Sequence, residues 1–227
     1  MTVGKDLVAT FESKDLGDAI TDLAEVGLDA LIDSNAIDSI PVLGTLKKLG
    51  SAVGAFRDYM LAKKIVRFLE EVAQLSEQER VKVMEGVASS AKDRERVGEV
   101  IVDLIDKADA TEKPGLIGKL FAAAGRGEIS SSDVLRLSAI ITRAYIDHLQ
   151  LLQEAVRLQN ADAAIKSALY ANGLMSLSVR ATTPAPPPGG LVSMKAMNQS
   201  LTAPFLVEFA VTADARTIAR VCFNASI

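Results

Sequence analysis

The sequence predicts a mainly α-helical protein: a multi-helix bundle that ends in a small C-terminal α+β module. Apolar residues recur every three or four positions through residues 15–158, which is the period of one helix face. Helix-capping sequences separate these segments. Further on, two short β-like runs enclose a Pro- and Gly-rich loop at 181–190, and a final helical pattern follows them.

The composition is that of a folded protein with a real core. The chain has 227 residues, 49% of them hydrophobic, and a formal net charge of −4. This apolar fraction is too high, and the charge too small, for a disordered chain. We expect two domains: the helical bundle over 1–143 and the α+β module over 144–227.

The first two helical regions carry opposite charge. Residues 1–38 hold nine acidic and two basic residues, and we expect an amphipathic helix from Leu16 to about Asn35. Ser39-Ile40-Pro41 begins the next helix, where Pro suits the first turn. Its 4,3 apolar spacing continues to Leu75, which predicts one long helix. Within it, 41–67 holds six basic residues and one acidic residue. An antiparallel pair would bring the opposite charges together.

The remaining bundle helices are marked by local start and stop signals. Ser76 and Glu79 form a capping-box sequence. Further helices are expected over 89–109, from Thr111 to the glycines at 125 and 127, and from Ser130 through Leu152. Short capped turns between helices are typical of an α-bundle.

The C-terminal order resembles a winged helix over about residues 145–225. The residues that carry the resemblance are the helix exit Leu169-Tyr170-Ala171-Asn172-Gly173-Leu174, the two β-like runs and the start of the last helix at Thr212. The resemblance implies that the helix over about 160–172 is a recognition helix and that 181–190 is the tip of the wing. The stretch 39–142, opened by Ser39-Ile40-Pro41-Val42-Leu43-Gly44, also resembles uncharacterised bacterial helical-bundle proteins, and that resemblance implies no activity.

Few residues in this chain are suited to catalysis or metal binding. It has one Cys and one His, which excludes an internal disulfide, a Cys-based zinc site and a His-rich metal site. His148 is adjacent to Asp147, so on a helix the two side chains point about 100° apart and the acid cannot orient the imidazole. The serines at 130–132 are explained by helix capping. We therefore expect no catalytic residue, no metal and no cofactor.

The preferred interpretation is a non-catalytic interaction or assembly protein of the cytoplasm, with a protein partner or a second copy as its ligand and a bacterial regulatory or defence setting. No small-molecule substrate is inferred. The start of the chain lacks a secretory signal, and no run of apolar residues is long enough for a transmembrane helix.

Two alternatives stay open. The first is a peripheral membrane protein that uses the amphipathic segment 41–67, with these candidate residues: Leu46, Lys47, Lys48, Leu49, Val53 and Phe56. The second is a winged-helix DNA-binding regulator, for which the candidates are Lys166, Arg180 and Lys195. The expected recognition helix carries one Lys and one Asp, so its charge disfavours nucleic acid.

Overall fold

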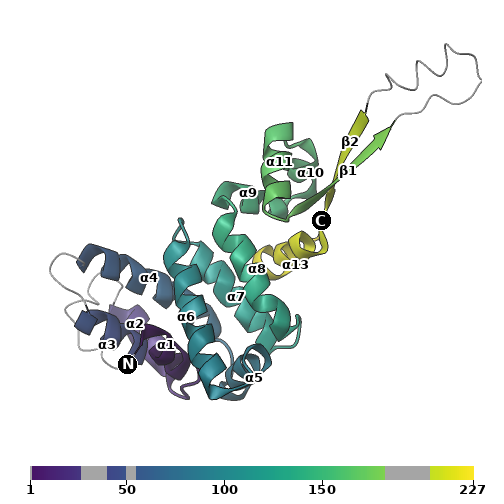
Figure 1. Ribbon diagram of the computed structural model, residues 1–227. Coiled ribbons are helices and arrows are strands. Elements are labelled where there is room, and N and C mark those ends of the chain that lie inside the picture. The colour runs from purple at the N-terminus through teal and green to yellow at the C-terminus, as the bar shows by residue number, and fades with distance from the viewer. Residues whose placement is uncertain (1, 27–39, 50–54, 182–204) are drawn as a thin grey trace, which may run out of the picture.

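The computed structural model describes residues 2–26, 40–49, 55–181 and 205–227 (Figure 1). Within these ranges the fold is mainly helical, with a two-stranded antiparallel hairpin near the C-terminus and a helix after it, which confirms the predicted fold class at this level. The elements of the bundle are α1 (Val3–Phe11), α2 (Leu16–Val26), α3 (Pro41–Leu49), α4 (Ala55–Val72), α5 (Glu77–Val87), α6 (Ala91–Lys107), α7 (Lys113–Gly125) and α8 (Ser131–Arg143).

Helix α7 lies at the centre of the bundle. Leu116, Ile117, Leu120 and Phe121 are buried, as the apolar pattern predicts. α7 packs against α4, α5 and α8. The rings of Phe11, Phe68 and Phe121 meet with centroids 5.3 to 6.2 Å apart, joining α1 and α4 to α7. Aromatic packing of this kind contributes about 0.5–1.5 kcal/mol per pair beyond burial.

Two helix crossings depend on glycine. A Cβ added to Gly98 of α6 would overlap the carbonyl oxygen of Gly4 in α1, and one added to Gly118 of α7 would lie 2.7 Å from the carbonyl oxygen of Phe68 in α4. At these points the helix backbones therefore touch with no side chain between them.

The predicted ends of α5 and α7 are confirmed. Ser76 and Glu79 form the complete capping box, in which the Ser76 N–H donates to the Glu79 carboxylate at 2.8 Å. α7 ends in a Schellman motif: Gly127 has a φ of 76°, and the N–H of Glu128 donates to the Ala123 carbonyl at 2.9 Å.

Two buried cations hold helix ends together. Arg80 is 2% exposed and donates to the carbonyls of Phe11, Ser13 and Leu75, which lie at or beyond the ends of α1 and α4. Lys113 is fully buried; it donates to the Thr142 carbonyl at 3.0 Å and pairs with Asp109 at 2.5 Å. Cations at helix C-termini complement the helix dipole and satisfy carbonyls that have no partner within the helix.

The expectation of one long helix through 41–67 and on to Leu75 is wrong. The structure has two helices, α3 and α4, which pack against each other. α3 buries Val42, Leu43 and Leu46, and it packs against α1. A 4,3 spacing describes a helix face and cannot show whether one helix or two carry it. Gly50 and Gly54, which are poor helix formers, are in the stretch between α3 and α4 that lies outside the described residues.

The acidic N-terminal region also differs from expectation. It begins with a separate helix, α1, before α2 starts at Leu16, and the predicted end near Asn35 lies outside the described residues. Two charged side chains of these regions pair with α6, while Asp6 of α1 accepts a hydrogen bond from Thr45 of α3. Glu12 pairs with Arg94 at 3.1 Å, and Arg57 of α4 pairs with Asp106 at 2.7 Å.

The helix predicted from Ser130 through Leu152 ends early, at Arg143. Three short elements follow: α9 (Ile146–Gln150), the 3₁₀ helix η2 (Leu151–Gln153) and α10 (Ala155–Asn160). The sequence around Ala144 has no Gly or Pro. The buried Lys113 ammonium donates a hydrogen bond to the Thr142 carbonyl at this end of α8.

The C-terminal part continues with α11 (Ala163–Ala171), β1 (Met175–Ala181), β2 (Phe205–Val211) and α13 (Ala213–Phe223). β1 pairs antiparallel with β2, from Met175 opposite Val211 to Ala181 opposite Phe205. α13 packs against α7, and Ile218, Ala219 and Cys222 are buried as its pattern predicts. The predicted wing tip at 181–190 falls almost entirely outside the described residues.

Candidate interaction surface

The hairpin of β1 and β2, called here the ribbon, stands away from the helices (Figure 1). Its base is held firmly. Gly173, with a φ of 79°, turns the chain out of α11 in a second Schellman motif, in which the Leu174 N–H donates to the Leu169 carbonyl at 2.9 Å. Thr212 closes the other side: its hydroxyl donates to the Gly173 carbonyl at 2.9 Å and also caps α13. Both strands of the ribbon are therefore anchored to helix ends at its base.

The register gives the ribbon two unlike faces. Directly paired residues lie on the same side of a sheet, and neighbours along a strand point to opposite sides. One side, called here the apolar ribbon face, carries Met175, Leu177, Val179, Val207, Phe209 and Val211. The other side carries Ser176, Ser178, Arg180, Leu206, Glu208 and Ala210.

The apolar ribbon face begins in the core and ends in solvent. Met175 is buried at its base, and Phe209 and Val211 pack partly against the core. Farther out, Leu177 is 39% exposed, Val179 is 54% exposed and Val207 is 50% exposed. A contiguous exposed apolar surface of this kind is typical of an interaction site.

A pocket of about 510 Å³ lies beside the base of the ribbon, lined by Arg136, Ile140, Arg143, Tyr170, Ala171, Asn172, Gly173 and Asp214. Arg136 binds both Asp133 and Asp214, and these hydrogen bonds raise the pKa of its guanidinium. The last turns of α8 and α11 both line this pocket, and helix C-termini disfavour anions. The charged residues of the lining are Arg136, Arg143 and Asp214, and the pocket has no nucleophile with an adjacent base.

The residues predicted for membrane contact are divided between core and surface. Leu46 is buried, while Lys47 and Lys48 are exposed on the outer side of α3. Val53 and the side chains of Leu49 and Phe56 lie outside the described part of the structure. Among the described residues, no helix has the length and apolar character that crossing a membrane would require.

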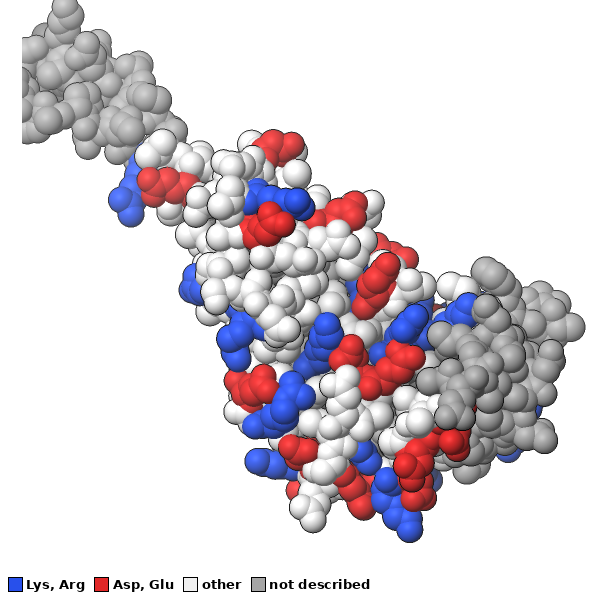
Figure 2. Space-filling view, turned by 180° about the vertical axis from the view of Figure 1, so that it is seen from behind, with Lys and Arg blue, Asp and Glu red and all other residues white. Residues whose placement is uncertain are grey.

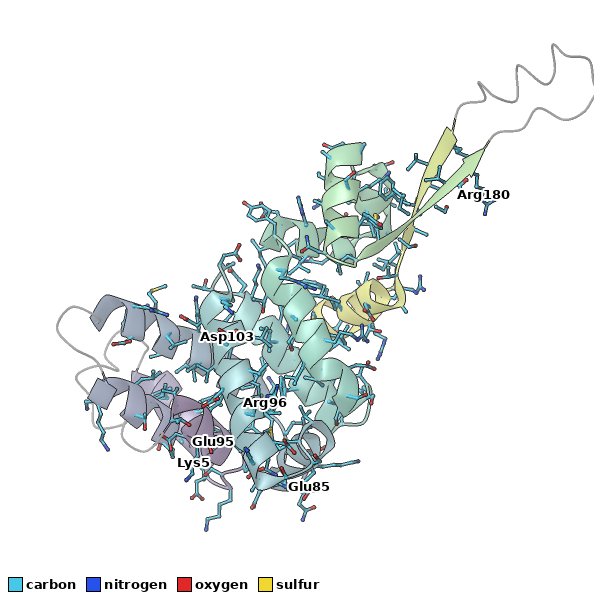
Figure 3. All side chains as sticks on the ribbon, in the orientation of Figure 1. Lys5, Glu85, Glu95, Arg96, Asp103 and Arg180 are labelled. Carbon is cyan, nitrogen blue, oxygen red and sulfur yellow. The ribbon has the colours of Figure 1, made fainter. Side chains whose placement is uncertain are left out.

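The residues predicted for nucleic-acid contact do not gather at one place. Lys166 of α11 is half-buried and donates to the Gln159 carbonyl at 2.7 Å. Arg180 lies at the far end of the ribbon, 3.8 Å from the Glu208 carboxylate (Figure 3). Lys195 lies outside the described residues. On the face drawn in Figure 2, basic and acidic side chains are interspersed over the helices.

Groups that could carry chemistry are few in the described structure. His148 is half-buried, with its ring edge-on to Tyr145 at 5.5 Å. Burial raises the pKa of the Cys222 thiol to about 12, which keeps it in the unreactive form at neutral pH. Across the described ranges, no three His, Cys, Asp or Glu side chains come together as metal ligands.

No protein-family model, curated protein or solved structure matches this chain. The winged-helix resemblance therefore stays a prediction, and function has to be argued from the surface itself. Sequence reasoning did not single out the apolar ribbon face. Apolar and polar residues alternate in Met175-Ser176-Leu177-Ser178-Val179, which indicates one apolar side of β1. Only the pairing with β2 shows that the apolar residues of both strands lie on the same side.

Proposed function

We propose that this chain is a non-catalytic interaction protein that assembles with another protein surface through its C-terminal ribbon. The observation that carries this proposal is the apolar ribbon face, which is free of charge and projects from the body with Leu177, Val179 and Val207 in solvent. Hairpins of two strands are marginal in water unless a further layer covers their apolar side. A protein partner supplies that layer.

The two alternative functions receive less support from the described residues. A membrane role for α3 requires a free apolar face, and Val42, Leu43 and Leu46 are committed to the core. Nucleic-acid binding requires several uncommitted cations on one surface, whereas Lys166 is engaged with a backbone carbonyl and Arg180 lies beside Glu208.

Site-specific photo-crosslinking in the host lysate tests the proposal. A photoreactive residue at Val179 sits on the apolar ribbon face, and one at Ser178 sits on the opposite face as the matched control. We expect a protein adduct of defined mass from position 179 that resists nuclease and is absent from position 178. Adducts to lipid or nucleic acid only, or equal adducts from both positions, would overturn the proposal.

A further inference from the structure

We infer that Asn172 is a site of spontaneous deamidation, which the folded base of the ribbon holds unreactive and which opening of this base exposes. The base of the ribbon means here residues 172–174 together with Thr212. The inference is independent of the proposed function, because it rests on the chemistry of this turn alone.

Asn172 is followed by glycine, and this is the sequence in which an asparagine amide is lost most readily. The chain contains a single Asn-Gly pair. The backbone nitrogen of Gly173 attacks the side-chain carbonyl carbon, Cγ, of Asn172, and glycine favours this attack because it has no side chain in the way. The bond from Cγ to the amide nitrogen breaks, and ammonia leaves with the proton of the Gly173 N–H. Water then opens the cyclic imide at either carbonyl, which gives aspartate or isoaspartate at position 172.

The folded turn keeps the two reacting atoms apart. The ring closes only when the Gly173 nitrogen lies on the same side of the Cα–C bond of Asn172 as Cβ does. At the ψ of 4° found for Asn172, the Gly173 nitrogen lies instead beside the Asn172 nitrogen. The ring therefore cannot form without a rotation of the backbone at this residue.

Hydrogen bonds around the turn oppose this rotation. The Gly173 N–H, which must lose its proton, donates to the Tyr170 carbonyl at 2.9 Å. The side-chain amide of Asn172 donates to the Ala168 carbonyl at 2.9 Å. On the other side, the Thr212 hydroxyl donates to the Gly173 carbonyl at 2.9 Å. The rate of reaction at Asn172 should therefore follow the fraction of molecules in which the base of the ribbon is open.

The product cannot rebuild the same turn. A carboxylate at position 172 has no N–H for the Ala168 carbonyl, and it places a negative charge at the C-terminal end of α11, which the helix dipole disfavours. Isoaspartate also carries the main chain through the side-chain methylene, which lengthens the backbone before Gly173 and disrupts the Schellman motif. One opening followed by reaction therefore weakens the base of the ribbon permanently.

Peptide mass spectrometry of the full chain, with isoaspartate detected by enzymatic methylation, measures the reaction. In concentrated guanidinium chloride we expect Asn172 to react faster than Asn160 and Asn224, each of which precedes alanine. In the folded chain we expect the rate at Asn172 to be at least about tenfold lower than in the denaturant. Equal rates at Asn172 in the two states would overturn the inference, as would an unfolded chain in which Asn160 or Asn224 reacts as fast.

Thr212→Val tests whether the base of the ribbon controls the rate. It removes the hydroxyl from the Gly173 carbonyl and should raise the rate at Asn172 in the folded chain about threefold or more, as expected for a lost hydrogen bond, with no change in the denaturant. Thr217→Val is the matched control, because the Thr217 hydroxyl donates to the Ala213 carbonyl within α13. Equal rates for the two variants would overturn the inference.

If Thr212→Val does not fold, the natural chain answers the same question in guanidinium chloride below its unfolding transition. Local opening of the ribbon base should already raise the rate at Asn172 there. A rate that rises only together with global unfolding would overturn the inference.

Asn172→Asp tests the effect of the product's charge, and Asn160→Asp, at the exposed end of α10, is its control. We expect hydrogen exchange at the Gly173 and Leu174 N–H groups to be about threefold or more faster in Asn172→Asp and unchanged in Asn160→Asp. Unchanged exchange in Asn172→Asp would overturn the inferred weakening of the ribbon base.

Discussion

The bundle and the C-terminal part use their apolar residues differently. Of the eight large hydrophobic side chains that are exposed in the described residues, only Val100 belongs to the bundle, and the others all lie from Tyr145 onward. The buried charged side chains show the reverse distribution, because Asp6, Arg80 and Lys113 all lie in the bundle. The described part of the bundle pairs its buried charges internally, while the C-terminal part leaves large apolar side chains exposed.

The largest effect is expected from Arg80, whose guanidinium joins three carbonyls. Arg80→Met removes these donors and leaves the Phe11 and Leu75 carbonyls without them, while the Ser13 carbonyl keeps the Leu16 N–H. This change should lower the free energy of unfolding by about 3–5 kcal/mol. Urea denaturation followed by circular dichroism measures the change. Arg57→Met is the control: Arg57 is 78% exposed and pairs with Asp106 at the surface, so its loss should change the free energy of unfolding only slightly. If both substitutions lowered the free energy of unfolding equally, burial would not explain the effect of Arg80.

A somewhat smaller effect is expected at the crossing of α1 and α6. Gly98→Ala places a methyl group against the Gly4 carbonyl and should lower the free energy of unfolding by about 3 kcal/mol, since the two backbones must separate. Gly115→Ala is the matched control in α7. Its Cβ would lie 3.9 Å from the Arg67 carbonyl oxygen of α4, which is an ordinary contact distance, and alanine favours a helix by up to about 1 kcal/mol relative to glycine. If Gly98→Ala left the free energy of unfolding unchanged, the backbones of α1 and α6 would not be in close contact at this crossing.

Asp109 makes part of the bundle's stability depend on pH. Its hydrogen bond with Lys113 lowers the pKa of the Asp109 carboxyl. The carboxylate therefore stabilises the fold above the ordinary carboxyl pKa, and this contribution is lost as the pH falls through the lowered value. Asp109→Asn should reduce stability at pH 7 and have little effect at pH 2, as denaturant titrations at both values would show.

Asp103→Asn serves as the control for that pH dependence. Asp103 pairs with Lys107 at 2.7 Å, with both side chains exposed. An exposed pair of this kind contributes little, so its loss should change stability only slightly at either pH. If the two substitutions gave the same pH dependence, the buried position of Lys113 would not be the cause.

The smallest effect on folding is expected in the ribbon. Val179→Thr keeps a β-branched side chain at a position that is 54% exposed, so the free energy of unfolding should change by no more than about 0.5 kcal/mol. Val83→Thr is the comparison in the bundle, where Val83 is fully buried and a hydroxyl would replace a methyl group in the core, at a cost of about 1–3 kcal/mol. A large loss at Val179 would mean that the ribbon face serves folding and not contact.

Local signals predicted much of this fold. The capping box at Ser76, the end of α7 at Gly127 and the start of α13 at Thr212 each depend on hydrogen bonds within a few residues, so the sequence alone identifies them. The strands β1 and β2 were visible as short apolar runs for the same reason. The apolar ribbon face does not follow from such local signals, because it depends on the pairing of residues about 30 positions apart.

The sequence by itself determined where most helices and strands form, because their periodicity and caps are local properties. Only the tertiary structure decided the division of 41–75 into α3 and α4, the end of α8 beside Lys113, and the burial of Arg80. It also decided that Leu177, Val179 and Val207 share one exposed face. Each of these features depends on contacts between segments distant in the chain, and no local pattern records which segments will meet.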